Sequence, residues 1–190
     1  MKAALLILSI ASLASGAFAG GTVFLENALG TGYVTLYSAS GPYAAAGTYQ
    51  VALLWYNGAS FVQEGAVYQT SIANADGPGF FNGEVVTVPD YQATGTFEVE
   101  GWTGNYSSYA SALFGGALVG LTSAFVNAEG NPSPPTPTPP GYISGYGGQG
   151  GWDGNLILGV PEPSTLALCV LAAGGVFLIR RRRQQSLKSP

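Results

Sequence analysis

The chain has 190 residues, of which only 8% are charged, and it contains ten acidic residues, six basic residues, one cysteine and no histidine. The basic residues lie near the two ends, so the body from Gly20 to Val160 carries nine carboxylates and no basic side chain. This composition excludes from the body Ser-His and Cys-His nucleophiles, Ser-Lys pairs, and zinc sites of His or thiolate. A field of one negative sign repels phosphate backbones, so we expect no nucleic-acid partner.

Residues 1–19 have the layout of a signal peptide. Met1-Lys2 supplies a short positive region, the stretch from Ala3 to Leu13 is apolar, and Ala17-Phe18-Ala19 has the small residues that signal peptidase requires. We therefore expect cleavage after Ala19 and export of the chain that follows. Without Cys, an exported body has no disulfides, and its stability depends on a hydrophobic core.

Residues 20–130 have the patterns of short β-strands separated by turns. Thr96-Phe97-Glu98-Val99-Glu100 alternates apolar and polar residues, and the segment from Tyr49 to Tyr56 is rich in aromatic and β-branched residues. Asn57-Gly58 suits a two-residue hairpin turn, and Asn82-Gly83 is a further turn signal. The other predicted strands are Thr22 to Glu26, Tyr33 to Tyr37, Ser60 to Glu64, Ala66 to Ile72, Glu84 to Val88 and Leu118 to Asn127.

About eight such strands predict an all-β ectodomain, an antiparallel β-sandwich of immunoglobulin-like or jelly-roll type. Only Tyr106 to Phe114 has a helical pattern. Residues 131–160 follow as a Pro/Gly-rich stalk or loop, because the prolines of 131–140 favour polyproline II. The stalk is slightly preferred over a loop inside the domain, although Leu156-Ile157-Leu158 is apolar enough to form a last strand.

The C-terminal segment has three parts in a fixed order. Pro161-Glu162-Pro163 precedes an apolar run, Leu166–Ile179, which is followed directly by the cluster Arg180, Arg181, Arg182 and Arg183. A charge-free run followed by arginines predicts a transmembrane helix over 166–179 with the four arginines as a membrane stop on the cytoplasmic side. Residues 184–190 would then be a cytoplasmic tail. At about 21 Å the helix is short against a hydrocarbon core of about 30 Å, and arginine snorkelling closes part of the difference.

Residues 161–183 resemble the PEP-CTERM sorting signal of Gram-negative bacteria that make exopolysaccharide. The resemblance implies that an exosortase, a membrane transpeptidase, recognises Pro161, Glu162 and Pro163 and processes the tail. The chain would be its substrate. It would be anchored in the inner membrane before processing and would afterwards reach the cell surface or the extracellular matrix, associated with exopolysaccharide or a biofilm.

Three features of the body bear on chemistry. Glu98 and Glu100 would share one face of a strand, and paired carboxylates are the machinery of glycoside hydrolases, although an alternating strand ordinarily presents its charges to solvent. Asn and Asp near glycine turns offer oxygen ligands for calcium but fit no EF-hand spacing, so the body has no predicted cofactor beyond calcium. The candidate calcium ligands are Asn74, Asp76, Asn82 and Glu84, or Asp153 with Asn155.

The body is also rich in Tyr and Trp. Exposed aromatic faces stack on sugar rings, whereas in a small cysteine-free sandwich most large aromatics fill the core. Trp55 and Trp102 are the candidate sugar contacts. The sequence therefore predicts an exported, non-catalytic surface or matrix protein. A carbohydrate-binding module is the alternative, and a glycoside hydrolase is a distant one.

Overall fold

The computed structural model describes residues 20–74, 76–133, 135–145 and 150–160. The predicted signal peptide with Ala17 and Ala19, the Pro161-Glu162-Pro163 motif and the apolar run lie outside these residues. The predicted membrane stop lies outside them too, and it consists of Arg180, Arg181, Arg182 and Arg183. Among the described residues, no helix is both long enough and apolar enough to cross a membrane.

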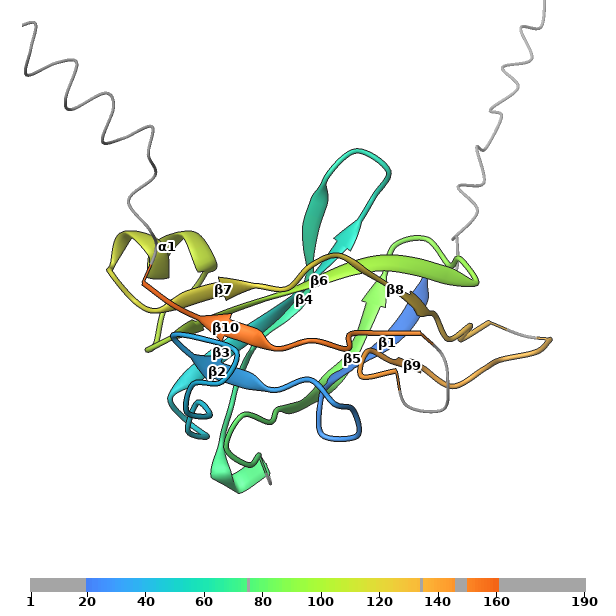
Figure 1. Ribbon diagram of the computed structural model, residues 1–190. Coiled ribbons are helices and arrows are strands. Elements are labelled where there is room, and N and C mark those ends of the chain that lie inside the picture. The colour runs from blue at the N-terminus through green and yellow to red at the C-terminus, as the bar shows by residue number, and fades with distance from the viewer. Residues whose placement is uncertain (1–19, 75, 134, 146–149, 161–190) are drawn as a thin grey trace, which may run out of the picture.

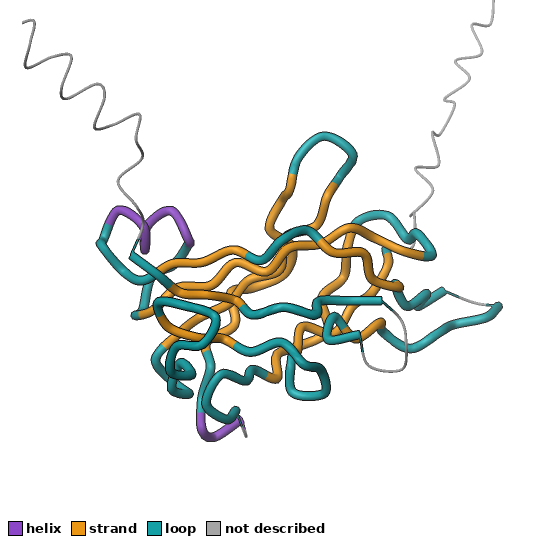
Figure 2. The backbone as a smooth tube through the Cα atoms, in the orientation of Figure 1, coloured by secondary structure: helices purple, strands orange, loops and turns teal. Residues whose placement is uncertain are grey.

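The described part of the chain is built mostly of strands, which confirms the all-β prediction (Figure 1). Among the described residues, helix is confined to two short segments, which Figure 2 draws in purple. The strands are β1 (Gly21–Glu26), β2 (Val34–Leu36), β3 (Tyr49–Tyr56), β4 (Phe61–Gln69), β5 (Asn82–Val88), β6 (Thr94–Thr103), β7 (Val119–Leu121), β8 (Phe125–Ala128), β9 (Gly141–Tyr142) and β10 (Leu156–Leu158). The helices are the 3-10 turn η1 (Ile72–Asn74) and α1 (Tyr109–Phe114), the latter inside the predicted segment 106–114.

The strands form three sheets. The largest has the order β4-β3-β6-β7, and β8 pairs with the same edge of β6 beyond β7. The second has the order β5-β1-β9, and the third pairs β10 with β2. The antiparallel prediction holds for most pairs but is wrong for two: β1 with β9 and β2 with β10 run parallel, because their partners return from far along the chain.

The main core lies where one face of the five-stranded sheet meets the two smaller sheets. It contains Val51, Leu53 and Trp55 of β3 and Phe97 and Val99 of β6, alternating residues that point to one side. The other sheets supply residues such as Val23, Leu25, Val86, Leu156 and Leu158. Alternation in β3 and β6 therefore places one face of each strand in the core.

A second, smaller cluster lies on the opposite face of the five-stranded sheet, beneath α1. It contains Ala52, Trp102, Val119 and Ala112, the last from the helix. The helix begins at a capping box in which Ser108 and Ser111 exchange hydrogen bonds between side chain and backbone. Part of this outer face is thus covered by α1.

The segment 131–160 belongs to the fold. Gly130 pairs with Thr22, and Val23 pairs with Gly141, so the proline-rich segment leaves β1 and returns to it. Hydrogen bonds from Asn131 and Thr138 close the base of this loop. The preference for a stalk is therefore corrected: the described prolines of this segment lie in a loop, and β10 is the last strand among the described residues, as the alternative expected.

Of the two Asn-Gly pairs that predicted turns, one forms a turn and the other does not. Asn57-Gly58 does form the β3–β4 hairpin, which projects from the sheet in Figure 1, but Tyr56 pairs with Phe61, so the loop has four residues. The Asn57 side chain accepts hydrogen bonds from the Ala59 and Ser60 N–H groups and thereby sets this longer turn. Asn82-Gly83 is not a turn, because both residues belong to β5.

Candidate functional site

The predicted sugar contacts are both buried. Trp55 is 5% exposed in the main core and Trp102 is 0% exposed beneath α1, so neither ring presents a face to a ligand. The Trp102 indole N–H donates to the Gln50 side chain at 2.8 Å and to the Tyr106 carbonyl at 3.2 Å. The structure corrects the prediction: large aromatics fill the spaces between the layers, and the buried N–H has its partners.

A different set of aromatic side chains is partly exposed. We call Tyr33, Tyr43 and Phe80 the tyrosine patch: the ring centroids of Tyr33 and Tyr43 are 5.1 Å apart and those of Tyr33 and Phe80 are 5.0 Å apart. Tyr43 is 52% exposed and its two neighbours are half-buried. The exposed Tyr43 ring packs on Tyr33, which Phe80 supports in turn, and such a ring is a surface on which a flat apolar ligand face can stack.

Glu98 and Glu100 lie on the outer face of β6, where they pair in register with Leu54 and Ala52 of β3. Both are half-buried. Burial raises the pKa of the Glu98 carboxyl and raises the pKa of Glu100 to about 7. Two carboxylates on one face confirm the predicted geometry, and the apolar neighbours explain why protonation is favoured there.

Three of the candidate calcium ligands, Asn74, Asp76 and Asn155, have hydrogen-bond partners within the fold. Asp76 accepts hydrogen bonds from Ser71 N–H at 2.7 Å, from Asn82 N–H at 2.8 Å and from the Tyr68 hydroxyl at 3.1 Å. The Asn155 carbonyl oxygen accepts from Tyr33 N–H, and its amide donates to Ala39. These side chains hold loops together. No group of three or more acidic, His or Cys side chains able to hold a metal ion occurs in the described part of the chain.

A pocket of about 110 Å³ lies between β4 and β5, the edge strands of two different sheets. The strand β4 has a bulge here. Val51 pairs with Tyr68 and Leu53 pairs with Glu64, so the three residues 65–67 of β4 lie opposite the single residue 52 of β3. This bulge supplies Gly65, Ala66 and Val67 to one wall. The remaining lining residues are Leu25, Tyr68, Glu84, Val85 and Val86.

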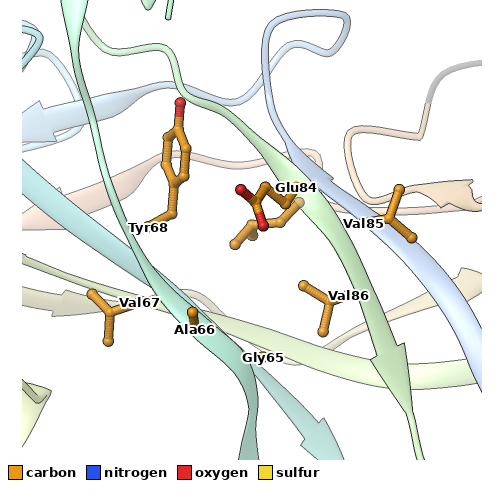
Figure 3. Close-up of a pocket in the computed structure, with 8 residues that line it drawn as sticks. Gly65, Ala66, Val67, Tyr68, Glu84, Val85 and Val86 are labelled. Atoms are coloured by element: carbon orange, nitrogen blue, oxygen red, sulfur yellow. The ribbon is translucent and has the colours of Figure 1, made fainter.

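Glycine is required at the centre of the bulge. Gly65 has a φ of 73°, and a Cβ at this position would lie 3.1 Å from a methyl of Val86. Figure 3 shows Glu84 on β5 directed toward β4, on the side where Tyr68 stands. The pocket thus combines apolar walls, one aromatic ring and one carboxylate.

Tyr68 is held in place from outside the pocket. Its hydroxyl donates to Asp76 and accepts from the Asn74 amide at 3.1 Å. Burial raises the pKa of Tyr68, and the negative charges of Asp76 and Glu84 raise it further. The site therefore has a negative potential, which no basic side chain in the body offsets.

Two buried carboxylates escaped the sequence reasoning. Glu26 is 1% exposed, and it accepts hydrogen bonds from the Ser144 hydroxyl and from Leu29 N–H. Glu129 is 5% exposed and accepts from Gln92 N–H at 2.8 Å, and burial raises its pKa. Gly21 and Gly95 make room for Glu129, since a Cβ on either would clash with its carboxylate oxygens. These two carboxylates connect distant segments.

The chain matches no family model, no curated protein and no solved structure.

Proposed function

We propose that this protein is an exported, non-catalytic component of the cell surface or extracellular matrix, delivered through its PEP-CTERM-like signal and associated with exopolysaccharide. The observation that carries the proposal is the order of Pro161-Glu162-Pro163, the apolar run and the four arginines Arg180, Arg181, Arg182 and Arg183. In this proposal signal peptidase removes residues 1–19, the helix over 166–179 anchors the chain in the inner membrane, and an exosortase processes the tail.

The described strands, from β1 at Gly21 to β10 at Leu158, lie within the predicted exported body. We propose that this body is a β-sandwich, because its main core lies between sheets and includes residues of all three.

The non-catalytic part of the proposal rests on the body's chemistry. It has no His, Cys, Lys or Arg, so a catalytic mechanism would depend on carboxylates and hydroxyls. Glu98 and Glu100 lie half-buried on the outer face of β6, and neither lines the β4–β5 pocket. A glycoside hydrolase therefore stays a distant alternative.

The sorting proposal is tested by replacing Pro161, Glu162 and Pro163 with alanine in a Gram-negative host that carries an exosortase. We expect the wild-type protein at the surface with a shortened C-terminus, and most of the variant uncleaved in the inner membrane, as followed by fractionation and intact mass. A variant with alanine at Pro137, Pro139 and Pro140 is the matched control. Normal surface delivery of the motif variant would contradict the proposal.

A carbohydrate-binding module is the second candidate, and the tyrosine patch is the observation that favours it. We expect Tyr43→Ala to reduce retardation of the protein in gels that contain the host exopolysaccharide, because stacking on one exposed ring contributes about 1 kcal/mol, or about fivefold in affinity. Tyr91→Ala removes a ring of 39% exposure elsewhere and is the control. Equal retardation of the two variants and the wild type would exclude the tyrosine patch as the sugar contact.

A further inference from the structure

The β4–β5 pocket holds a carboxylate that nothing in the described structure neutralises. Glu84 is exposed at the pocket and makes no hydrogen bond or ion pair with another described residue. The body has no Lys, Arg or His that could approach it. Within the described residues, therefore, no side chain supplies a positive charge for Glu84, and a cationic ligand would supply one.

The size of the pocket limits the ligand. A single water needs on the order of 10–15 Å³ of such space, and drug-sized ligands occupy pockets of about 300 Å³ or more. At about 110 Å³, the pocket is too large for a single water or bare metal ion and too small for a substituted sugar ring. It fits a compact group of a few heavy atoms.

The side chains that line the pocket favour one class of compact cation. Leu25, Ala66, Val67, Val85 and Val86 are apolar, and Tyr68 adds an aromatic ring. Among the lining side chains, Glu84 is the one acceptor left open, because the Tyr68 hydroxyl already donates to Asp76 and accepts from Asn74. A primary ammonium carries three N–H donors and would leave donors without side-chain partners, whereas a quaternary ammonium needs no hydrogen bonds.

We propose that the pocket between β4 and β5 binds a quaternary ammonium group, with Glu84 as its counter-charge, the Tyr68 ring as a cation–π face and the side chains of Leu25 and Val86 as apolar walls. The negative charge of Asp76 beyond the Tyr68 ring adds to the attraction. This binding is independent of how the chain is sorted, and it goes beyond a surface role.

The test is a titration of the full-length chain in a choline-free, non-ionic detergent, followed by NMR of the Leu25 and Val86 methyl groups. We expect tetramethylammonium and choline to shift both residues with a millimolar Kd, and 3,3-dimethylbutan-1-ol, the uncharged isostere of choline, to bind about fivefold more weakly or not at all. Sodium chloride at equal ionic strength corrects for salt. Stronger binding of choline than of phosphocholine identifies a free solute as the ligand, and equal binding identifies a lipid headgroup.

Glu84→Gln is expected to weaken choline binding by about fivefold or more, because it removes the counter-charge and leaves the fold intact at an exposed position. Glu98→Gln removes the same charge from β6, which β3 separates from β4, and should leave binding within about twofold. Tyr68→Phe keeps the ring and should retain binding, whereas Tyr68→Leu should lose it. Equal effects of Glu84→Gln and Glu98→Gln, or equal binding of choline and its uncharged isostere, would overturn the proposal.

Discussion

We expect Asp76→Ala to lower the free energy of unfolding by about 3 kcal/mol. Asp76 is 7% exposed, and its two oxygens accept hydrogen bonds from Ser71 N–H, Asn82 N–H and the Tyr68 hydroxyl. Alanine removes all three acceptor contacts and leaves two backbone donors and a hydroxyl without this partner. Because Ser71 and Asn82 are the two ends of the β4–β5 connection, the loss also loosens the position of β5.

Urea unfolding measures this effect, with Asp153→Ala as the control, since Asp153 is exposed. We expect the control to change the free energy of unfolding by less than about 0.5 kcal/mol. Asp76→Asn should fall between the two, because one of its amide positions is a donor that faces a backbone donor. An Asp76→Ala variant as stable as the Asp153→Ala control would show that the loop does not depend on this carboxylate.

The longer strands were predictable because both of their signals are local. β3 and β6 combine β-branched or aromatic residues with alternation, and the predicted segments Tyr49 to Tyr56 and Thr96 to Glu100 lie within them. Ser60 to Glu64 and Ala66 to Ile72, predicted as two strands, fall on the two halves of β4, although the second runs past the end of β4 at Gln69 into η1. The gap between the two predicted strands is Gly65, which lies in the bulge beside the pocket. A glycine inside a strand is a signal of a bulge, but here it indicates the end of a strand equally well.

The short strands were not predictable in the same way. β9 has two residues and β10 has three, too few for a period, and each is defined by its parallel partner rather than by its own residues. The proline-rich loop is similar, since composition indicates its stiffness but not that both of its ends return to β1. Contacts between distant segments determine these pairings: the apolar run Leu156-Ile157-Leu158 indicated a possible strand at β10, but not its parallel partner β2.

Side-chain exposure was the least predictable part of the candidate site. Trp55 and Trp102 lie on opposite faces of one sheet, and both are buried because the second face has its own cover in α1. Glu26 and Glu129 carry charges that alternation would assign to solvent, yet hydrogen bonds from distant residues hold them inside. Residue type gives the usual environment, and only packing identifies the exceptions.

The protein should be more stable in mild acid than in mild base. Burial raises the pKa of Glu64, Glu98, Glu100 and Glu129 above 4.5, and the pKa of Glu100 reaches about 7. The folded state therefore holds these protons more tightly than the unfolded state, so their contribution is fully present below about pH 4.5 and is lost as the pH rises through the folded pKa. For Glu100 this window runs from 4.5 to about 7.

Without solvent screening, the pKa shift of Glu100 would correspond to a loss of about 3 kcal/mol in the free energy of unfolding as the pH rises. Because the side chain is only half-buried, solvent screening reduces the expected loss to about 1 kcal/mol. Urea unfolding at about pH 5 and about pH 8 should show this loss, and Glu100→Gln should recover most of it at the higher pH. Asp153→Asn removes an equal charge from an exposed position and tests whether general repulsion among the body's nine carboxylates is the cause. If Asp153→Asn restores as much stability as Glu100→Gln, general repulsion among the carboxylates causes the pH dependence. If Glu100→Gln alone restores it, the outer face of β6 is where the folded body retains a proton that it must give up near neutral pH.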